Sequence, residues 1–368
     1  MIRVPAACLF LVVYVAALPA FVRADDFKPQ IDQTIRSLIE EKKTLGVAVG
    51  ILTQNEPAKA FGYGKVAQKS DKEPDGDTIF EIGSITKVFT ALLLSDMAAE
   101  GLVKLDDPVR LYLPDNVKVP TRGGKEITLL DLATHRSGLP RLPTNFVYSQ
   151  MRSASNPYAH YTPQLMFAFL SGYELPRGIG SKYEYSNFGF GLLGYALARK
   201  ANRSYEELVV KRICEPLKMK DTRITLSLEL RARLAEGHTA GGKVAANWDF
   251  DALAGCGALR SSVSDLLIFA AANLGRIKTP LLSAMETCHA ERGDSDVKTV
   301  RMGLGWHSLH PQGTEQKVIW HNGGTGGYHS YLGFIKESQT AVVVLSNSTT
   351  SIDAQALLIL KAITPAWK

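Results

Sequence analysis

The chain has 368 residues, of which 45% are hydrophobic and 21% are charged, with four cysteines and a formal net charge of +6. This composition is typical of a soluble protein with a core, and it excludes a disordered chain, a collagen-like repeat and a disulfide-dense scaffold. The positive charge is spread along the chain rather than concentrated in blocks, so it does not indicate a nucleic-acid partner. The length predicts roughly two domains, or one large unit with two lobes.

Residues 1–24 have the pattern of a secretory signal peptide. Arg3 supplies a positive n-region, an apolar run covers residues 6–22, and Val22-Arg23-Ala24 offers a small-x-small cleavage site. The alternative is an N-terminal membrane anchor, but the run is short for a span and contains Pro19. We therefore expect cleavage, no stable membrane span afterwards, and a periplasmic or secreted location.

Cleavage of the signal peptide leaves three cysteines, Cys214, Cys256 and Cys288. An odd number of cysteines in an oxidising compartment allows at most one disulfide and leaves one thiol over. Their spacing does not identify which pair forms, if any.

The expected secondary structure changes in type along the chain. The N-terminal part predicts a helix and two short strands around a polar turn, and the C-terminal part predicts three strands and a helix. Between them, helical patches alternate with loops punctuated by Pro and Gly. Helices are expected over 27–43, 85–102, 127–134, 163–170, 187–200, 205–213, 264–274 and 352–363, and strands over 46–53, 58–63, 317–321, 328–335 and 341–346.

The simplest assembly of these elements is an α+β fold. It has one antiparallel sheet built from both ends of the chain, flanked by the terminal helices, with an inserted all-helical lobe. We assign residues 25–105 and 290–368 to a discontinuous sheet domain and residues 106–289 to a mainly helical domain.

Ser84 and Lys87 form an S-x-x-K pair at the start of the helix expected over 85–102. Positions three apart share one helix face, so the hydroxyl lies beside the amine. A helix N-terminus disfavours an ammonium and favours developing negative charge, which suits Lys87 as a neutral base for a nucleophilic Ser84. The alternative is a capping serine followed by a solvated lysine. A second match, Ser295 to Lys298, has no apolar helix behind it, so we assign Ser295 to a loop.

Tyr185-Ser186-Asn187 is the only Tyr-x-Asn sequence in the chain. A tyrosine near a lysine ammonium ionises at reduced cost and can relay a proton between a nucleophile and a leaving group. Asn187 could hold the lysine and a substrate amide. The alternative is a packing tyrosine before an asparagine that caps a helix.

Residues 321–327, with the sequence HNGGTGG, end a predicted strand with four glycines. Glycine lets a ligand backbone lie against a strand edge, and N–H groups exposed there can polarise a carbonyl. The alternative is a flexible hairpin loop.

Other patterns in the chain fit known motifs less well. Gly189, Gly191 and Gly194 match G-x-G-x-x-G but follow a polar turn rather than a buried strand, so we expect close helix packing rather than dinucleotide binding. His307 and His310 have no carboxylate partner in the sequence pattern, and neither an H-E-x-x-H nor a G-x-S-x-G motif occurs. We therefore expect no cofactor and no metal.

In this order, the three motifs resemble those of serine β-lactamases and penicillin-binding proteins, in particular the class C-like branch whose second motif is Tyr-x-Asn. The resemblance covers essentially the whole mature chain, including residues 80–87, 105–108, 127–140 and 254–266. It implies the fold described above and an exported serine hydrolase that forms an acyl-enzyme on amide bonds of β-lactams or D-Ala-D-Ala-type peptides. The alternatives are a carboxylesterase with the same site and a non-catalytic sensor of peptidoglycan or penicillin.

The resemblance also implies the roles of individual residues in the first two motifs. Ser84 is the acylated nucleophile and Lys87 its base partner. Tyr185 relays the proton, and Asn187 orients the substrate amide. The oxyanion hole would use the backbone N–H groups of Ser84 and Gly324.

The third motif departs from the family pattern. β-Lactamases normally have Lys-Thr-Gly or Lys-Ser-Gly there, and the lysine attracts the substrate carboxylate. This chain has His321-Asn322-Gly323 followed by Gly324, and a histidine is largely neutral at pH 7. We expect His321, Gly323 and Gly324 to bind a small-molecule or peptidoglycan-peptide substrate, while the oligomeric state stays open.

Overall fold

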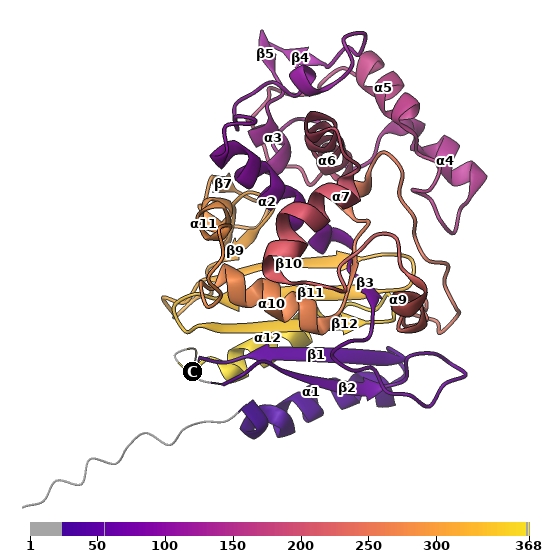
Figure 1. Ribbon diagram of the computed structural model, residues 1–368, viewed down its shortest axis with the longest axis vertical. Coiled ribbons are helices and arrows are strands. Elements are labelled where there is room, and N and C mark those ends of the chain that lie inside the picture. The colour runs from indigo at the N-terminus through magenta and orange to yellow at the C-terminus, as the bar shows by residue number, and fades with distance from the viewer. Residues whose placement is uncertain (1–23, 55, 366, 368) are drawn as a thin grey trace, which may run out of the picture.

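An eight-stranded antiparallel sheet forms the centre of the protein, seen in a computed structural model that describes residues 24–54, 56–365 and 367 (Figure 1). The signal peptide expected over residues 1–24 lies outside the described residues, except for Ala24. The strand order is β2-β1-β12-β11-β10-β9-β8-β7. The strands are β1 (Gly46–Leu52), β2 (Lys59–Gly64), β7 (Gly293–Asp294), β8 (Val300–Met302), β9 (His307–Leu309), β10 (Val318–Gly324), β11 (His329–Ile335) and β12 (Thr340–Ser346).

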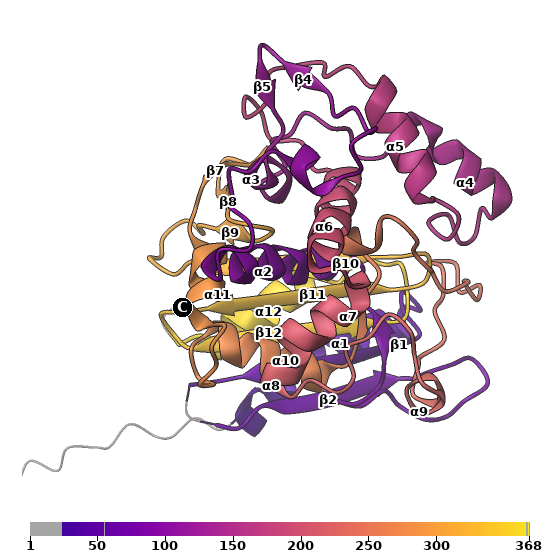
Figure 2. The same ribbon diagram turned by 45° about the horizontal axis from the view of Figure 1, so that its top comes forward.

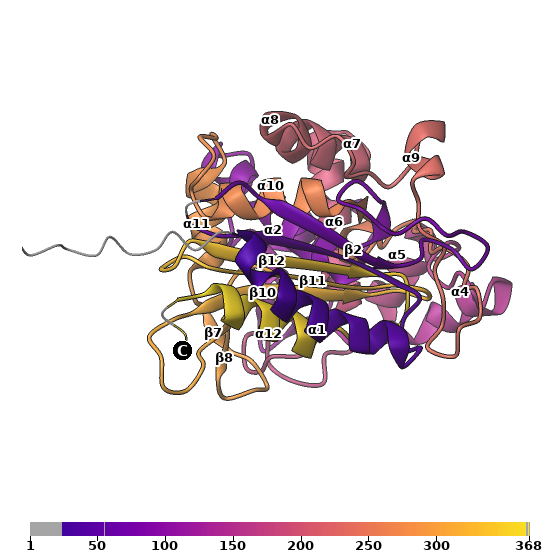
Figure 3. The same cartoon turned by 90° about the horizontal axis from the view of Figure 1, so that it is seen from below.

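Helices cover both faces of this sheet (Figure 3). The first helix α1 (Lys28–Glu40) and the last helix α12 (Asp353–Ile363) share an apolar cluster with the strands on one face. On the other face lie α2 (Thr86–Ala99), α10 (Val263–Asn273) and α11 (Leu282–His289). Because both faces are buried, β1 and β12 are continuous apolar runs rather than alternating ones.

A lobe of short helices lies above the sheet, and Figure 2 shows α6 running between the two. The glycine-rich helix α6 packs against α2 and against the helices of the lobe, so α6 links the two parts. The remaining helices are α3 (Leu129–Ala133), α4 (Val147–Arg152), α5 (Pro163–Gly172), α6 (Asn187–Ala201), α7 (Tyr205–Val209), α8 (Glu215–Leu217) and α9 (Leu228–Ala232). Two-residue strands pair as β3 (Phe80–Glu81) with β6 (Arg260–Ser261) and β4 (Thr121–Arg122) with β5 (Lys125–Glu126).

The predicted α+β class and the sheet built from both ends of the chain are confirmed, since β1 pairs with β12 along its length. One helix differs from the predicted division. α10 falls within residues 106–289, yet it packs on β1 and β12. A Cβ atom on Gly50 of β1 would lie 2.5 Å from Val263 and 2.7 Å from Leu267, so helix and strand are in close contact. Hydrophobic periodicity predicts a helix but not the surface on which it packs.

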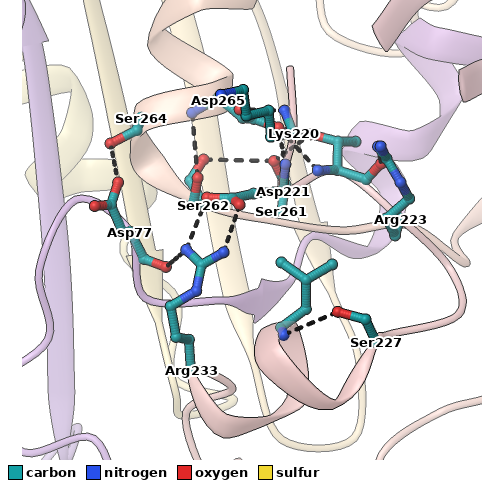
Figure 4. Close-up of polar contacts among 12 residues, drawn as sticks. Asp77, Lys220, Asp221, Arg223, Ser227, Arg233, Ser261, Ser262, Ser264 and Asp265 are labelled. Carbon is teal, nitrogen blue, oxygen red and sulfur yellow. Dashed lines mark hydrogen bonds and ion pairs between the residues drawn. The ribbon is translucent and has the colours of Figure 1, made fainter. Parts of the chain in front are cut away.

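A buried carboxylate, that of Asp265 in the first turn of α10, binds the connection between α8 and α9 through residues 220–222 (Figure 4). Asp265 Oδ2 accepts hydrogen bonds at 2.8 Å from the backbone N–H groups of Asp221 and Thr222 and from the Thr222 hydroxyl. Asp265 Oδ1 accepts a further one from the Lys220 N–H at 3.2 Å. Asp221 is in turn paired with Arg233 at 2.6 Å.

Replacing Asp265 by alanine should lower the free energy of unfolding by about 2–4 kcal/mol, because buried N–H groups lose a charged acceptor. Urea denaturation of both proteins measures this difference. Glu229→Ala removes an exposed carboxylate from the nearby helix α9 and should change the free energy by less than about 0.5 kcal/mol. Equal effects of the two substitutions would show that the Asp265 bonds do not stabilise the fold.

Candidate active site

A cleft of about 580 Å³ lies between residues of β9–β11 and loops of the helical lobe. Five of the seven predicted site residues line it, and these are Ser84, Tyr185, Asn187, Gly323 and Gly324. The structure therefore brings together residues that are up to 240 positions apart in the sequence.

Lys87 lies directly behind the predicted nucleophile. Ser84 belongs to a 3-10 turn (Gly83–Ile85) that leads into α2, and Lys87 is the second residue of that helix. The Lys87 ammonium donates to Ser84 Oγ at 3.0 Å, to Asn187 Oδ1 at 2.9 Å and to the carbonyl oxygen of Cys256 at 2.7 Å. Its side chain is fully buried, and three acceptors match its three protons.

Burial, with a smaller contribution from the charge of Arg141, lowers the pKa of Lys87 from its ordinary value to about 7, although Cys256 opposes this effect. Near neutral pH a large fraction of the amine is therefore unprotonated and can accept the proton of Ser84. Loss of hydration, rather than the helix N-terminus expected from the sequence, is the main cause of this shift.

Tyr185 lies close to the same amine, with Lys87 Nζ 4.8 Å from the centroid of its ring. Burial raises the pKa of Tyr185 above 10, although Ser84 and Arg141 oppose this effect. The expected ionisation of the tyrosine beside an ammonium is therefore not favoured here. The phenol stays protonated, and it can pass a proton only by accepting one as it donates its own.

Asn187 begins α6 and fixes the lysine. Its Oδ1 accepts from Lys87, and its Nδ2 donates to the Tyr158 hydroxyl at 2.9 Å. The predicted contact with Lys87 is therefore present. The predicted contact with a substrate amide stays a prediction, because both polar atoms of the side chain already have partners.

The glycines of α6 allow it to approach the turn that carries Cys256. A Cβ atom on Gly191 would lie 2.4 Å from Leu253, and one on Gly194 would lie 2.7 Å from Gly255. This confirms that the G-x-G-x-x-G sequence serves close packing. The approach places the Cys256 carbonyl against Lys87.

The end of β10 packs tightly against the nucleophile turn. A Cβ atom on Gly323 would lie 2.1 Å from the carbonyl oxygen of Ile82 and 2.8 Å from the backbone nitrogen of Ser84. Gly83 has a φ of +48°, and its own Cβ would lie 2.8 Å from the nitrogen of Gly324. Only glycine fits at Gly83 and Gly323, so strand and turn are held in contact.

The hairpin after β10 determines where the N–H group of Gly324 points. Thr325 donates its backbone N–H to the carbonyl of Tyr328 at 3.1 Å. The next pair, Gly324 with His329, is then a non-hydrogen-bonded pair, so the Gly324 N–H points away from β11 and toward the cleft. Together with the N–H of Ser84, it provides the two donors that an oxyanion hole needs.

His321 does not line the cleft. Its side chain is 1% exposed, and its Nδ1–H donates to the carbonyl of Asn322 at 2.6 Å. Burial lowers its pKa well below 6.5, and His307 and Lys87 lower it further. The expectation that His321 binds substrate therefore needs correction. The ring is neutral and packs against the ring of His307 with centroids 5.1 Å apart, where it cannot attract a carboxylate.

The weaker motifs lie outside the catalytic arrangement. Ser295 lies in a turn after β7 and accepts the N–H of Val297, which confirms its assignment to a loop. His310 does have a carboxylate partner, since it lies 2.8 Å from Glu291. Among the described residues, no group of three or more His, Cys, Asp or Glu side chains could hold a metal ion.

The three cysteines of the described chain are buried and unpaired. No helix within the described ranges has the length and apolar character needed to cross a membrane.

Several contributors to the site were not predicted, among them two aromatic residues, an arginine and a backbone carbonyl. Tyr158 stacks on Phe250 with ring centroids 4.5 Å apart, and Trp248 lies beside it at 5.3 Å. Arg141 lines the cleft as well, and Cys256 contributes a backbone carbonyl. No signal in the sequence could have shown the carbonyl, because every residue has one, and the aromatic residues belong to no recognisable motif.

Comparison with known proteins accounts for this arrangement. The model of the β-lactamase family matches residues 31–363. The chain belongs to the β-lactamase family. It is a serine hydrolase of this family, and the resemblance inferred from its three motifs is confirmed.

Individual relatives within the β-lactamase family cover most of the chain. The D-alanyl-D-alanine-carboxypeptidase/endopeptidase AmpH of Escherichia coli is 30% identical over 82% of this chain and 80% of its own length. A β-lactamase of Pseudomonas fluorescens is 28% identical over 88% of this chain and 94% of its own. A solved structure, the β-lactamase/D-alanine carboxypeptidase of Yersinia pestis, is 26% identical with a TM-score of 0.77, covering 94% of this chain and all of that one.

Gly323→Ala should lower the melting temperature and reduce kcat roughly 10-fold to 10³-fold, because the methyl group pushes β10 away from the oxyanion donors. Thermal denaturation and hydrolysis of a p-nitrophenyl ester measure the two effects. Gly324→Ala is the control for stability, since its Cβ would have no neighbour closer than 3.9 Å. Equal melting temperatures for the two variants would contradict the close contact at Gly323.

The rate of acylation should rise with pH through about 7 as Lys87 loses its proton, because the protonated amine cannot accept a proton from Ser84. The profile of kcat/KM for a neutral ester between pH 5.5 and 8.5 tests this. Lys87→Ala should remove this rise of the rate with pH, and it should lower kcat roughly 10²–10⁴-fold. A flat profile of the unaltered enzyme across this range would rule out Lys87 as the base.

Proposed function

We propose that this protein is an exported serine peptidase that cleaves D-Ala-D-Ala-type peptides through an acyl-enzyme on Ser84. The observation that carries the proposal is the 3.0 Å contact between Ser84 Oγ and a buried lysine whose pKa lies near 7. The relatives named as D-alanine carboxypeptidases support the substrate class. The expected signal sequence supports a periplasmic or secreted location.

The proposed reaction has two steps. Lys87 accepts the proton of Ser84 while Oγ forms a bond to the substrate carbonyl carbon, and the N–H groups of Ser84 and Gly324 stabilise the oxyanion. Tyr185 donates its own proton to the departing nitrogen as the C–N bond breaks and takes up the proton held by Lys87, which restores both groups and leaves the acyl group on Ser84. A water molecule then attacks the ester and restores the free serine.

The third motif bears on which substrates the cleft accepts. A β-lactam has the same acyl-D-amino-acid shape, so we expect it to acylate Ser84. The buried, neutral His321 lacks the attractive charge that β-lactamases place at this position, so we expect slow turnover of β-lactams.

The same neutral position also favours a second candidate, a carboxylesterase, because an uncharged ester needs no cation in the site. A non-catalytic sensor fits less well, since Ser84, Lys87 and Asn187 keep their mutual hydrogen bonds.

A fluorescent penicillin should label one site in the protein, Ser84, because among the described residues only this hydroxyl accepts a hydrogen bond from a buried amine. Gel fluorescence and peptide mapping by mass spectrometry identify the labelled residue. The Ser84→Ala variant should show no label, whereas label on Ser295 would refute the assignment.

Turnover of nitrocefin, of a D-Ala-D-Ala peptide and of a short-chain p-nitrophenyl ester can be measured in parallel. We expect the enzyme to release D-alanine from the peptide and to hydrolyse nitrocefin slowly. Tyr185→Phe should lower peptide turnover roughly 10²–10⁴-fold with an unchanged circular dichroism spectrum. Hydrolysis of the ester without any release of D-alanine would replace the peptidase by the carboxylesterase.

A further inference from the structure

Arg141 is a charged residue of the cleft that the three motifs do not include. Its guanidinium carbon lies 5.0 Å from the centroid of the Tyr185 ring, and its side chain forms no ion pair with any described residue. Its backbone carbonyl accepts the N–H groups of Asn187 at 3.0 Å and Phe188 at 3.2 Å. The residue is therefore anchored to the start of α6 while its charge stays available to a ligand.

The other basic groups lining the cleft are histidines. Burial lowers the pKa of His307 to about 4 and also lowers the pKa of His329. Within the described residues that line the cleft, Arg141 is thus the one that carries a full positive charge at neutral pH.

The negative charge in the cleft belongs to Asp296, and its influence overlaps with that of Arg141 at Tyr183. The charges of Asp296 and Arg141 both act on Tyr183, but only Asp296 acts on His307, whereas Arg141 acts on Lys87 and Tyr185. Asp296 is not within ion-pair distance of Arg141 in the described structure. The positive charge therefore lies on the side of the cleft where the leaving group takes up its proton.

We propose that Arg141 determines specificity by binding the carboxylate of the leaving group, in place of the cation that is missing at His321. In a peptide that ends in a D-amino acid, only the α-carbon separates the departing nitrogen from the terminal carboxylate. The departing nitrogen must lie near Tyr185 to receive its proton. The terminal carboxylate therefore also lies near the Arg141 guanidinium, which packs over the Tyr185 ring. The planar guanidinium presents paired N–H donors that match the two carboxylate oxygens. This inference rests on the proposed function, because it assumes an acyl transfer with a carboxylate-bearing leaving group.

A matched pair of esters tests this role without depending on peptidase activity. One is an N-acyl-D-alanyl-D-lactate, whose leaving group has an α-carboxylate, and the other is the corresponding D-lactamide, which is neutral. The preference is the ratio of kcat/KM for the two esters. Arg141→Gln should reduce the preference for the carboxylate ester about five- to twentyfold, because a charge-assisted pair is lost. Arg141→Lys should retain part of it, since its charge lacks the fork geometry.

Arg231→Gln is the matched control, because it removes the same charge from an exposed position on α9 outside the cleft lining. It should leave the preference unchanged. If Arg141→Gln slows both esters equally, Arg141 acts only through Tyr185 and the proposal fails. An unaltered preference in Arg141→Gln also overturns it. An enzyme that cleaves both esters but no D-Ala-D-Ala peptide contradicts the proposed substrate, while the ratio still decides the role of Arg141.

Discussion

The burial of one amine, that of Lys87, is the interaction on which the site depends. An ammonium without water must find acceptors inside the protein, and Lys87 finds one each on the nucleophile turn, on α6 and on the turn of Cys256. Three separate segments are therefore held together by the same group. The energetic cost of burying that group also lowers its pKa to about 7, so the structural centre of the site is also the base that we propose.

Glycine has a complementary role, because it allows the backbones around this amine to approach one another. Gly191 and Gly194 let α6 contact the turn that carries Cys256, and Gly323 lets β10 contact the nucleophile turn. The first contact positions the base, and the second positions the oxyanion donors. A side chain at any of these positions would separate segments whose backbone groups take part in the site.

Much of the fold could be predicted because periodicity carries it. The sequence shows directly the apolar runs of the terminal strands and the helix after Ser84. The sequence could not predict which surface α10 packs on, because a hydrophobic pattern does not identify a packing partner. It could not predict the strands β7–β9 either, because strands of two or three residues leave little pattern. In the site, Ser84, Lys87, Tyr185 and Asn187 lie together as their motifs predicted. The protonation states did not follow, because the burial that leaves Tyr185 protonated and His321 uncharged comes from residues distant in sequence.

The pairing of β1 with β12 joins residues 47–52 to residues 341–346, which are 289 to 299 positions apart in the chain. Contacts between distant segments are slow to form, since the long connection must first be brought together. The oxyanion glycine on β10 also comes late in the chain, long after the nucleophile. An unfinished chain would thus carry Ser84 without the strand that completes its site. Hydrolytic activity is consequently tied to synthesis through β12, and a partly synthesised chain would be inert.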